Sequence, residues 1–288
     1  MRVGVVRCGF RHVTRLPHPA AGASRRVAGT DASGGRAPRP GPAPPPSGPG
    51  RRQRGYGGGV TSTNSAAAWT VHRAGERYEG GDAQAGVTTR HSFSFGPHYD
   101  PDNLRFGALL AVNEERLAPG AGFAEHPHSH TEIVTWVAEG VLAHRDSAGH
   151  TTTVRPGDLQ HLSAASGVRH EEREGGGDGR DLVFTQMWLA PRQPGGDPSY
   201  TVRRALPAPV ARYEVPAAGA VLHVHRPAPG ALVEPPRAPY LYVHVVRGTL
   251  RLADGAALAP GDALRARGGA PALTALDAAE VLVWEMAD

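Results

Sequence analysis

The chain has 288 residues, enough for one large domain or two of ordinary size. No segment approaches the run of about 20 apolar residues that a membrane-spanning helix needs, so no membrane partner is expected. The single cysteine, Cys8, excludes a disulfide framework and any thiolate-rich zinc or iron–sulfur site. We therefore expect a cytoplasmic location and, if there is a metal, ligands of nitrogen and oxygen from among the 15 histidines and 27 acids.

The N-terminal segment, residues 1–65, differs in composition from the rest. Its first 60 residues hold 11 arginines, 9 prolines and 13 glycines but only one acid, Asp31. Such a segment cannot bury enough apolar surface to offset its ordering entropy, so residues 1–65 are predicted to be a disordered tail. The other 228 residues hold 20 arginines and 26 acids, so the net charge of +4 comes from the tail.

Three other interpretations of the tail remain open. An Arg-rich, acid-poor segment is typical of an organelle transit peptide. The run Arg51-Arg52-Gln53-Arg54 is a weak candidate for nucleic-acid binding, which is expected nowhere else in the chain. Translation could also begin at Val60, in which case the native protein would lack the tail.

From Trp69 onward, short alternating segments are separated by Gly, Pro and Asp turns, a pattern that predicts an all-β sandwich or barrel. The expected strands include residues 104–112, 132–137, 141–145 and 182–189. A second strand-rich block spans about residues 221–284. Both blocks follow the order strand, glycine turn, strand, Pro-Gly-Asp, strand, so we predict two β-domains of similar plan, residues 66–195 and 196–288.

Two pairs of polar residues in the first block could meet at one point. His126-Pro-His128 is followed some forty residues later by His170-Glu-Glu172. Residues two apart in a strand point to the same side, so each pair can aim its side chains together. Three imidazoles and a carboxylate suit iron, manganese, nickel, copper or zinc. The pair His223-Val-His225 has no downstream partner and is interpreted as an ordinary strand.

These motifs resemble the cupin signature and, more closely, the pirin family of two-cupin proteins. The resemblance covers about residues 66–287, and its most specific stretches are 90–101, 126–149, 156–172 and 186–188. It implies two tandem cupin (double-stranded β-helix, jelly-roll) domains packed together. It also implies one divalent metal in the N-terminal domain, usually Fe(2+), with Ni, Mn, Cu or Zn as alternatives. The pirin-type ligands fall on His126, His128, His170 and Glu172.

The neighbouring polar residues receive supporting roles. Glu132 stands where many other cupins place a ligand glutamate, but pirins use the later one, so Glu132 is expected to support the site. Glu171 is expected to face away from it, and His130 to lie on its rim. Surface positions in turns or strands are predicted for three further histidines: His144, His150 and His161. The second domain has no such histidine pair in residues 233–240, so it is expected to be metal-free.

The resemblance implies an oxidoreductase of the quercetin 2,3-dioxygenase type, which cleaves an aromatic flavonol with O2 and releases carbon monoxide. Glu172 would take the proton of the flavonol 3-hydroxyl as general base. A flat pocket could be lined by Phe95, Phe123, Trp136 and Met187. The alternative is a non-catalytic, iron-dependent redox sensor that binds a transcription factor or a metabolic enzyme through the same four ligands. A sugar-binding or isomerase cupin is a less favoured third class.

Overall fold

The computed structural model describes residues 61–64 and 67–287, and side chains from Trp69 onward. The predicted tail therefore lies outside the described residues, apart from residues 61–64. Within those ranges the structure is all-β, as predicted, and contains no α-helix. It has three short 3-10 turns, η1 (Ala74–Glu76), η2 (Ala83–Ala85) and η3 (Pro216–Ala218). None of its helical turns is long enough to cross a membrane.

The first barrel is built from two antiparallel sheets. The larger has seven strands in the order β13 (Ser199–Arg203), β10 (Leu159–Ser163), β7 (Glu132–Glu139), β12 (Leu182–Leu189), β5 (Leu109–Leu117), β4 (Val87–His91) and β3 (Tyr78–Asp82). The smaller has the order β6 (Gly122–His128), β11 (Val168–Glu174), β8 (Leu142–Asp146) and β9 (Thr151–Val154). Apolar side chains of both sheets, such as Leu142 and Phe184, form one buried cluster between them.

The second barrel repeats this plan. Its larger sheet has the order β1 (Thr61–Asn64), β2 (Ala67–His72), β20 (Ala263–Arg267), β17 (Tyr240–Arg247), β22 (Glu280–Met286), β15 (Ala220–His225) and β14 (Val210–Val215). Its smaller sheet has the order β16 (Leu232–Val233), β21 (Leu273–Ala275), β18 (Leu250–Leu252) and β19 (Ala257–Leu258). The interior is apolar, as the buried Leu241, Val243 and Leu264 illustrate.

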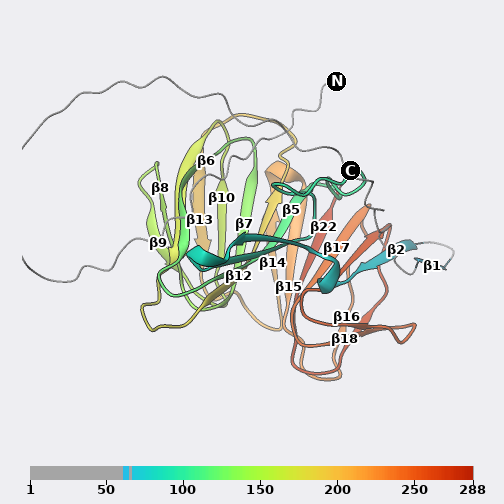
Figure 1. Cartoon of the computed structure of the whole chain (residues 1–288). Coiled ribbons are helices and arrows are strands. Elements are labelled where there is room, and N and C mark those ends of the chain that lie inside the picture. The colour runs from blue at the N-terminus through green and yellow to red at the C-terminus, as the bar shows by residue number, and fades with distance from the viewer. Residues whose placement is uncertain (1–60, 65–66, 288) are drawn as a thin grey trace, which may run out of the picture. The chain divides into compact units, whose positions relative to one another are not determined.

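The two barrels lie side by side and exchange strands at their margins (Figure 1). Strand β2, although it precedes the first barrel in the chain, pairs with β20 of the second. Strand β13, beyond residue 196, pairs with β10 of the first. The domain boundary at 195/196 stays a prediction, and the sheets interlock across it.

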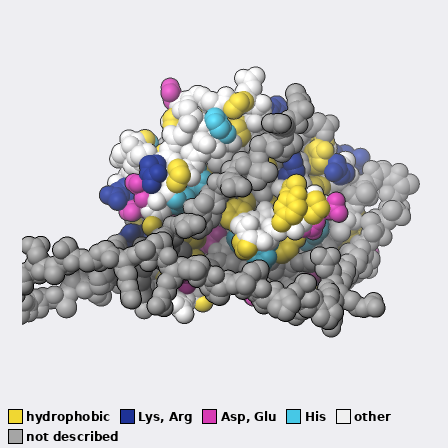
Figure 2. Space-filling view, turned by 45° about the horizontal axis from the view of Figure 1, so that its top comes forward, with side chains coloured by type: hydrophobic (Ala, Val, Ile, Leu, Met, Phe, Trp, Pro, Cys, Tyr) yellow, Lys and Arg dark blue, Asp and Glu magenta, His cyan; other side chains and the backbone are white. Residues whose placement is uncertain are grey.

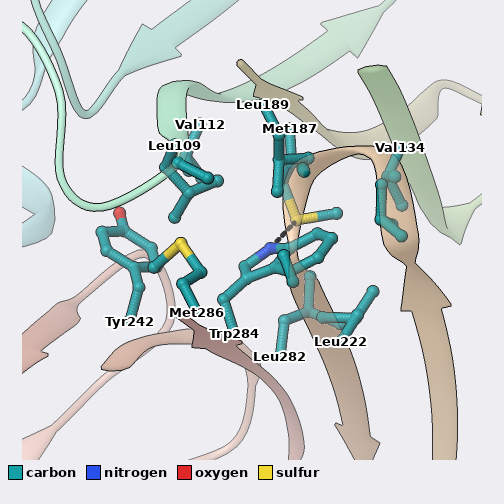
Figure 3. Packing of buried hydrophobic residues seen from close by; sticks show 14 of the residues in the cluster. Leu109, Val112, Val134, Met187, Leu189, Leu222, Tyr242, Leu282, Trp284 and Met286 are labelled. Carbon is teal, nitrogen blue, oxygen red and sulfur yellow. Dashed lines mark hydrogen bonds between the residues drawn. The ribbon is translucent and has the colours of Figure 1, made fainter. Parts of the chain in front are cut away.

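A shared apolar core joins the two larger sheets. Strand alternation sends one set of side chains into each barrel and the other set into this core. From the first barrel it receives residues such as Met187 and Val134, and from the second Leu222 and Trp284. The indole Nε1 of Trp284 donates to Met187 Sδ at 3.0 Å, the dashed contact in Figure 3. The first barrel's larger sheet thus separates its interior from the neighbouring barrel.

Candidate metal centre

Adjacent strands β6 and β11 carry the four residues predicted to bind metal. His126 and His170 are directly opposite one another in the pairing, and His128 is opposite Val168. The register shifts between His170 and Glu172, so the ladder is irregular at this point. His128, His170 and Glu172 are almost fully buried, with 6%, 1% and 1% of their surface exposed. The pairing of β6 with β11 therefore brings two motifs that are far apart in the sequence to one place inside the barrel.

Three imidazoles converge there. The Nε2 atoms of His126 and His170 are 3.1 Å apart. The ring centre of His128 lies 4.8 Å from that of each of the other two. Its Nε2 is buried and has no hydrogen-bond partner among the described residues. An unpartnered buried nitrogen is costly unless something binds it, so the cluster points to a ligand that accepts imidazole lone pairs.

The geometry and charge state of the cluster fit a divalent metal. Two imidazole nitrogens about 2.1 Å from one ion at a right angle are about 3.0 Å apart, close to the observed separation. Burial, helped by the neighbouring histidines, lowers the pKa of His128 to about 3. Burial likewise lowers the pKa of His170 to about 4, against the opposing effect of Glu172. Both rings are thus neutral near pH 7, which is the form that coordinates a metal.

Glu172 is held in place by two glutamine amides. Gln160 Nε2 donates to its Oε1 and Gln186 Nε2 to its Oε2, each at 2.7 Å. Burial alone would raise the pKa of Glu172, but His170, His144 and the Gln160 amide outweigh burial and hold the pKa well below its usual range. The side chain is therefore a buried carboxylate whose two oxygens have fixed directions.

Two groups of side chains could hold an ion, and they share His170. The first consists of His126, His128 and His170; the second consists of His144, His170 and Glu172. The four predicted ligands thus lie in one contiguous cluster, though the assignment of all four to a single ion remains a prediction. His130 is exposed, and neither it nor Glu132 belongs to a cluster among the described residues. Glu132 instead accepts hydrogen bonds from His161 at 2.7 Å and Ser163 at 2.9 Å.

His144 is the residue that the sequence interpretation placed wrongly. It was expected at the surface, but only 1% of it is exposed. Its Nε2 lies 3.1 Å from Asp146 Oδ2 and its Nδ1 lies 3.9 Å from Glu172 Oε1. Burial opposes its charged form, yet Glu172 and Asp146 raise the pKa of His144 overall. The missed signal was parity, because His144 alternates in step with the buried Leu142 and Asp146 along β8.

The expected aromatic lining needs a similar correction. Trp136 and Met187 are completely buried in the core between the barrels, so they cannot line a pocket at the metal cluster. Alternation along β12 turns the neighbouring Trp188 inward instead, where its ring lies edge-on to His128 with centres 4.9 Å apart. Phe123 does lie near the cluster, with its ring 6.5 Å from that of His126.

A second buried carboxyl was not identified from the sequence. Glu115 on β5 is 4% exposed and accepts a hydrogen bond from the Thr89 hydroxyl at 2.5 Å. Burial, to which the charge of Glu172 adds, raises the pKa of Glu115 to about 8. Only the alternation of β5, which faces Asn113, Glu115 and Leu117 the same way, could have indicated its burial.

The outer surface of β11 is polar, as predicted. Glu171 pairs with Arg145 at 3.0 Å and with Arg173 at 3.7 Å, on the face opposite to Glu172. Arginine and acidic side chains also lie next to one another on the face shown in Figure 2. The ion pairs on the outer face of β11 therefore give no reason to assign a chemical role to Glu171.

Comparison with known proteins agrees with the fold and the site motifs. The family model described as Pirin matches residues 72–189. A Mycobacterium tuberculosis protein provisionally named a quercetin 2,3-dioxygenase is 41% identical over an alignment of 216 positions, which covers 69% of this chain and 88% of the relative. The quercetin 2,3-dioxygenase of Escherichia coli is 40% identical over 114 residues, which are 40% of this chain and 49% of that protein.

Solved structures of a bacterial pirin also resemble this chain in fold. The crystal structure of YhhW from Escherichia coli superposes with a TM-score of 0.69 at 27% identity, over 76% of this chain and 97% of YhhW. A structure of the bacterial pirin YhhW in complex with nickel(II) gives a TM-score of 0.67 at 26% identity, over 76% of this chain and 98% of YhhW. On the combined evidence of sequence, fold and relatives, the chain belongs to the pirin family.

Proposed function

We propose that this pirin is a metal-dependent dioxygenase of the quercetin 2,3-dioxygenase type. The observation that supports this proposal most directly is that three imidazoles converge beside a carboxylate. One of these imidazoles, His128, has a buried Nε2 without a hydrogen-bond partner among the described residues. His126, His128, His170 and Glu172 would hold one divalent ion, with Fe(2+) as our first choice and Ni(2+) as the next. The names of several relatives supply the substrate class, a flavonol together with O2.

The chain's own residues suit the first step of such a reaction. A bound divalent metal would act as a Lewis acid toward the 3-hydroxyl and 4-carbonyl oxygens of the flavonol. Glu172 would take the 3-hydroxyl proton, because each of its oxygens keeps a lone pair beyond the one that a glutamine amide occupies. Gln160 and Gln186 would keep the carboxylate aimed during the transfer. The buried Trp188 would help to exclude water from the reacting group.

The test is oxygen consumption with quercetin by iron-loaded protein, compared with His128→Ala and with His130→Ala as the matched control. His130 belongs to the same histidine run but is exposed and outside the cluster. We expect turnover in the wild type and in His130→Ala, and none in His128→Ala. Iron bound at the site without turnover would overturn the dioxygenase and favour the redox-sensor alternative. Failure to bind any of the candidate metals would overturn both.

A further inference from the structure

A row of aromatic rings leads from the candidate metal ligands to the segment between β4 and β5, residues 92–108. Trp188, which lies edge-on to His128, is itself met edge-on by Phe95 of this segment, with ring centres 5.2 Å apart. Phe95 in turn stacks on His91 at 4.7 Å. Phe95 is only partly buried, whereas Trp188 is nearly inaccessible. The segment therefore presents an aromatic surface one ring away from a candidate metal ligand.

An arginine of the second barrel holds this segment. Arg265 on β20 donates from Nη1 to Asn103 Oδ1 at 2.8 Å and from Nη2 to the Ser92 carbonyl oxygen at 2.9 Å. Its guanidinium carbon lies 4.1 Å from the centre of the Phe93 ring. Forked donation combined with stacking is a use of arginine that lysine cannot reproduce. One side chain thus binds the segment on both sides of Phe95, at Ser92 and at Asn103.

The segment is also organised internally around the same two anchor points. Asn103 Nδ2 donates to the Ser92 carbonyl oxygen at 3.1 Å, and the Ser94 amide donates to the Asn103 carbonyl oxygen at 2.9 Å. The Ser94 hydroxyl donates to the Asp100 carbonyl oxygen at 2.9 Å. Arg265 therefore acts on a loop that is already closed, and its effect is to fix that loop against the barrel.

We propose that Arg265 is a positioning residue through which the metal-free barrel sets the substrate side of the metal site. It fixes Phe95 against the buried Trp188, so that the accessible part of the Phe95 ring forms the wall on which an aromatic substrate packs. This inference rests on the proposed function for its substrate class. The candidate ligands lie on β6 and β11, away from the anchored segment in the chain, so loss of Arg265 changes substrate binding and leaves metal affinity nearly unchanged.

The experiment compares Arg265→Met and Arg265→Lys with Arg267→Met in the full chain loaded with iron. Arg267 is the matched control because it lies two residues away on the same strand. Its guanidinium lies over Tyr240 and, like that of Arg265, near the Phe106 ring, but among the described residues it makes no hydrogen bond to Ser92 or Asn103. Should Arg265→Met fold poorly, Asn103→Ala removes one acceptor from the other side of the same contact. The measurements are KM and kcat for quercetin, metal affinity by titration, and hydrogen exchange of residues 92–106.

We expect Arg265→Met to raise KM roughly tenfold, the size of a lost charge-assisted hydrogen bond, with a much smaller change in kcat. Hydrogen exchange of residues 92–106 should speed up, Arg265→Lys should recover only part of the loss, and Arg267→Met should match the wild type. Wild-type KM in both Arg265→Met and Asn103→Ala, or equal effects of Arg265→Met and Arg267→Met, would overturn the proposal. Absence of turnover in the wild type would instead refute the proposed function, while faster exchange specific to Arg265→Met would still support the anchoring role.

Discussion

Two buried carboxyl groups on the walls of the first barrel have opposite proton affinities. Glu172 is surrounded by His170, His144 and glutamine amides that favour its charged form. For Glu115, burial raises the pKa further than the Thr89 hydroxyl and the charge of Arg77 lower it, and the charge of Glu172 adds to the effect of burial. The same buried interior thus stabilises one carboxylate and one carboxylic acid, and the difference comes from the imidazoles and amide donors that surround Glu172.

The raised pKa of Glu115 predicts a specific pH dependence of stability. Its folded-state pKa of about 8 exceeds its ordinary value of 4.5, so the folded protein holds a proton that the unfolded chain releases. This contribution is fully present below pH 4.5 and is lost as the pH rises through 8. In metal-free protein, Glu115→Gln should therefore become more stable relative to wild type between pH 5 and pH 8, by roughly 3 kcal/mol.

Urea unfolding at the two pH values measures this difference. Glu214→Gln is the control, because Glu214 is exposed on β14 and its replacement should leave the difference unchanged. Parallel pH profiles for wild type and Glu115→Gln would show that Glu115 is ionised in the folded state. From the sequence, the alternation of β5 indicates only that Glu115 shares a face with Asn113 and Leu117; it does not indicate that the carboxyl group holds a proton.

At the scale of the strand, alternation along β11 separates two adjacent glutamates. Glu172 points into the cluster, whereas Glu171 pairs with Arg145 outside. We predict that Glu172→Gln lowers the affinity for Ni(2+) roughly tenfold or more, while Glu171→Gln stays close to the wild type. Calorimetric titration of the metal-free proteins gives both affinities. Equal losses in the two variants would mean that overall charge, and not ligation by Glu172, controls binding.

Alternation also explains how far the sequence could predict the site. The His126/His128 and His170/Glu172 pairs were predicted to converge because a two-residue spacing shares a face. The same alternation in β8 puts His144 on the face of the buried Leu142 and Asp146. Alternation does not indicate which face of β7 or β12 points into the barrel. Trp136 and Met187, predicted to line a pocket, therefore lie on the opposite face of the sheet. That face is apolar because the second barrel packs against it.

At the scale of the whole molecule, the two barrels are joined by a core that belongs to neither alone. The all-β class and the internal repeat were predictable from turn spacing. The exchange of β2 and β13 between the barrels was not, because short strands carry no signal for which sheet edge they join. This core and the exchanged strands imply that the barrel with the candidate metal site depends on its neighbour for stability.

That dependence predicts cooperative loss of structure when the shared core is damaged. Trp284 is fully buried on β22 of the second barrel and contacts Met187 of the first. Trp284→Ala should lower the free energy of unfolding by about 3–5 kcal/mol, the usual cost of removing a buried tryptophan side chain. Trp284→Phe keeps most of the volume, loses the hydrogen bond to sulfur, and should cost much less.

Hydrogen exchange should show strands β5 and β12 losing protection together with β17 and β22, because all four border the same core. Loss confined to β17 and β22, with the first barrel still protected, would mean that the barrels fold independently and that only local contacts couple them.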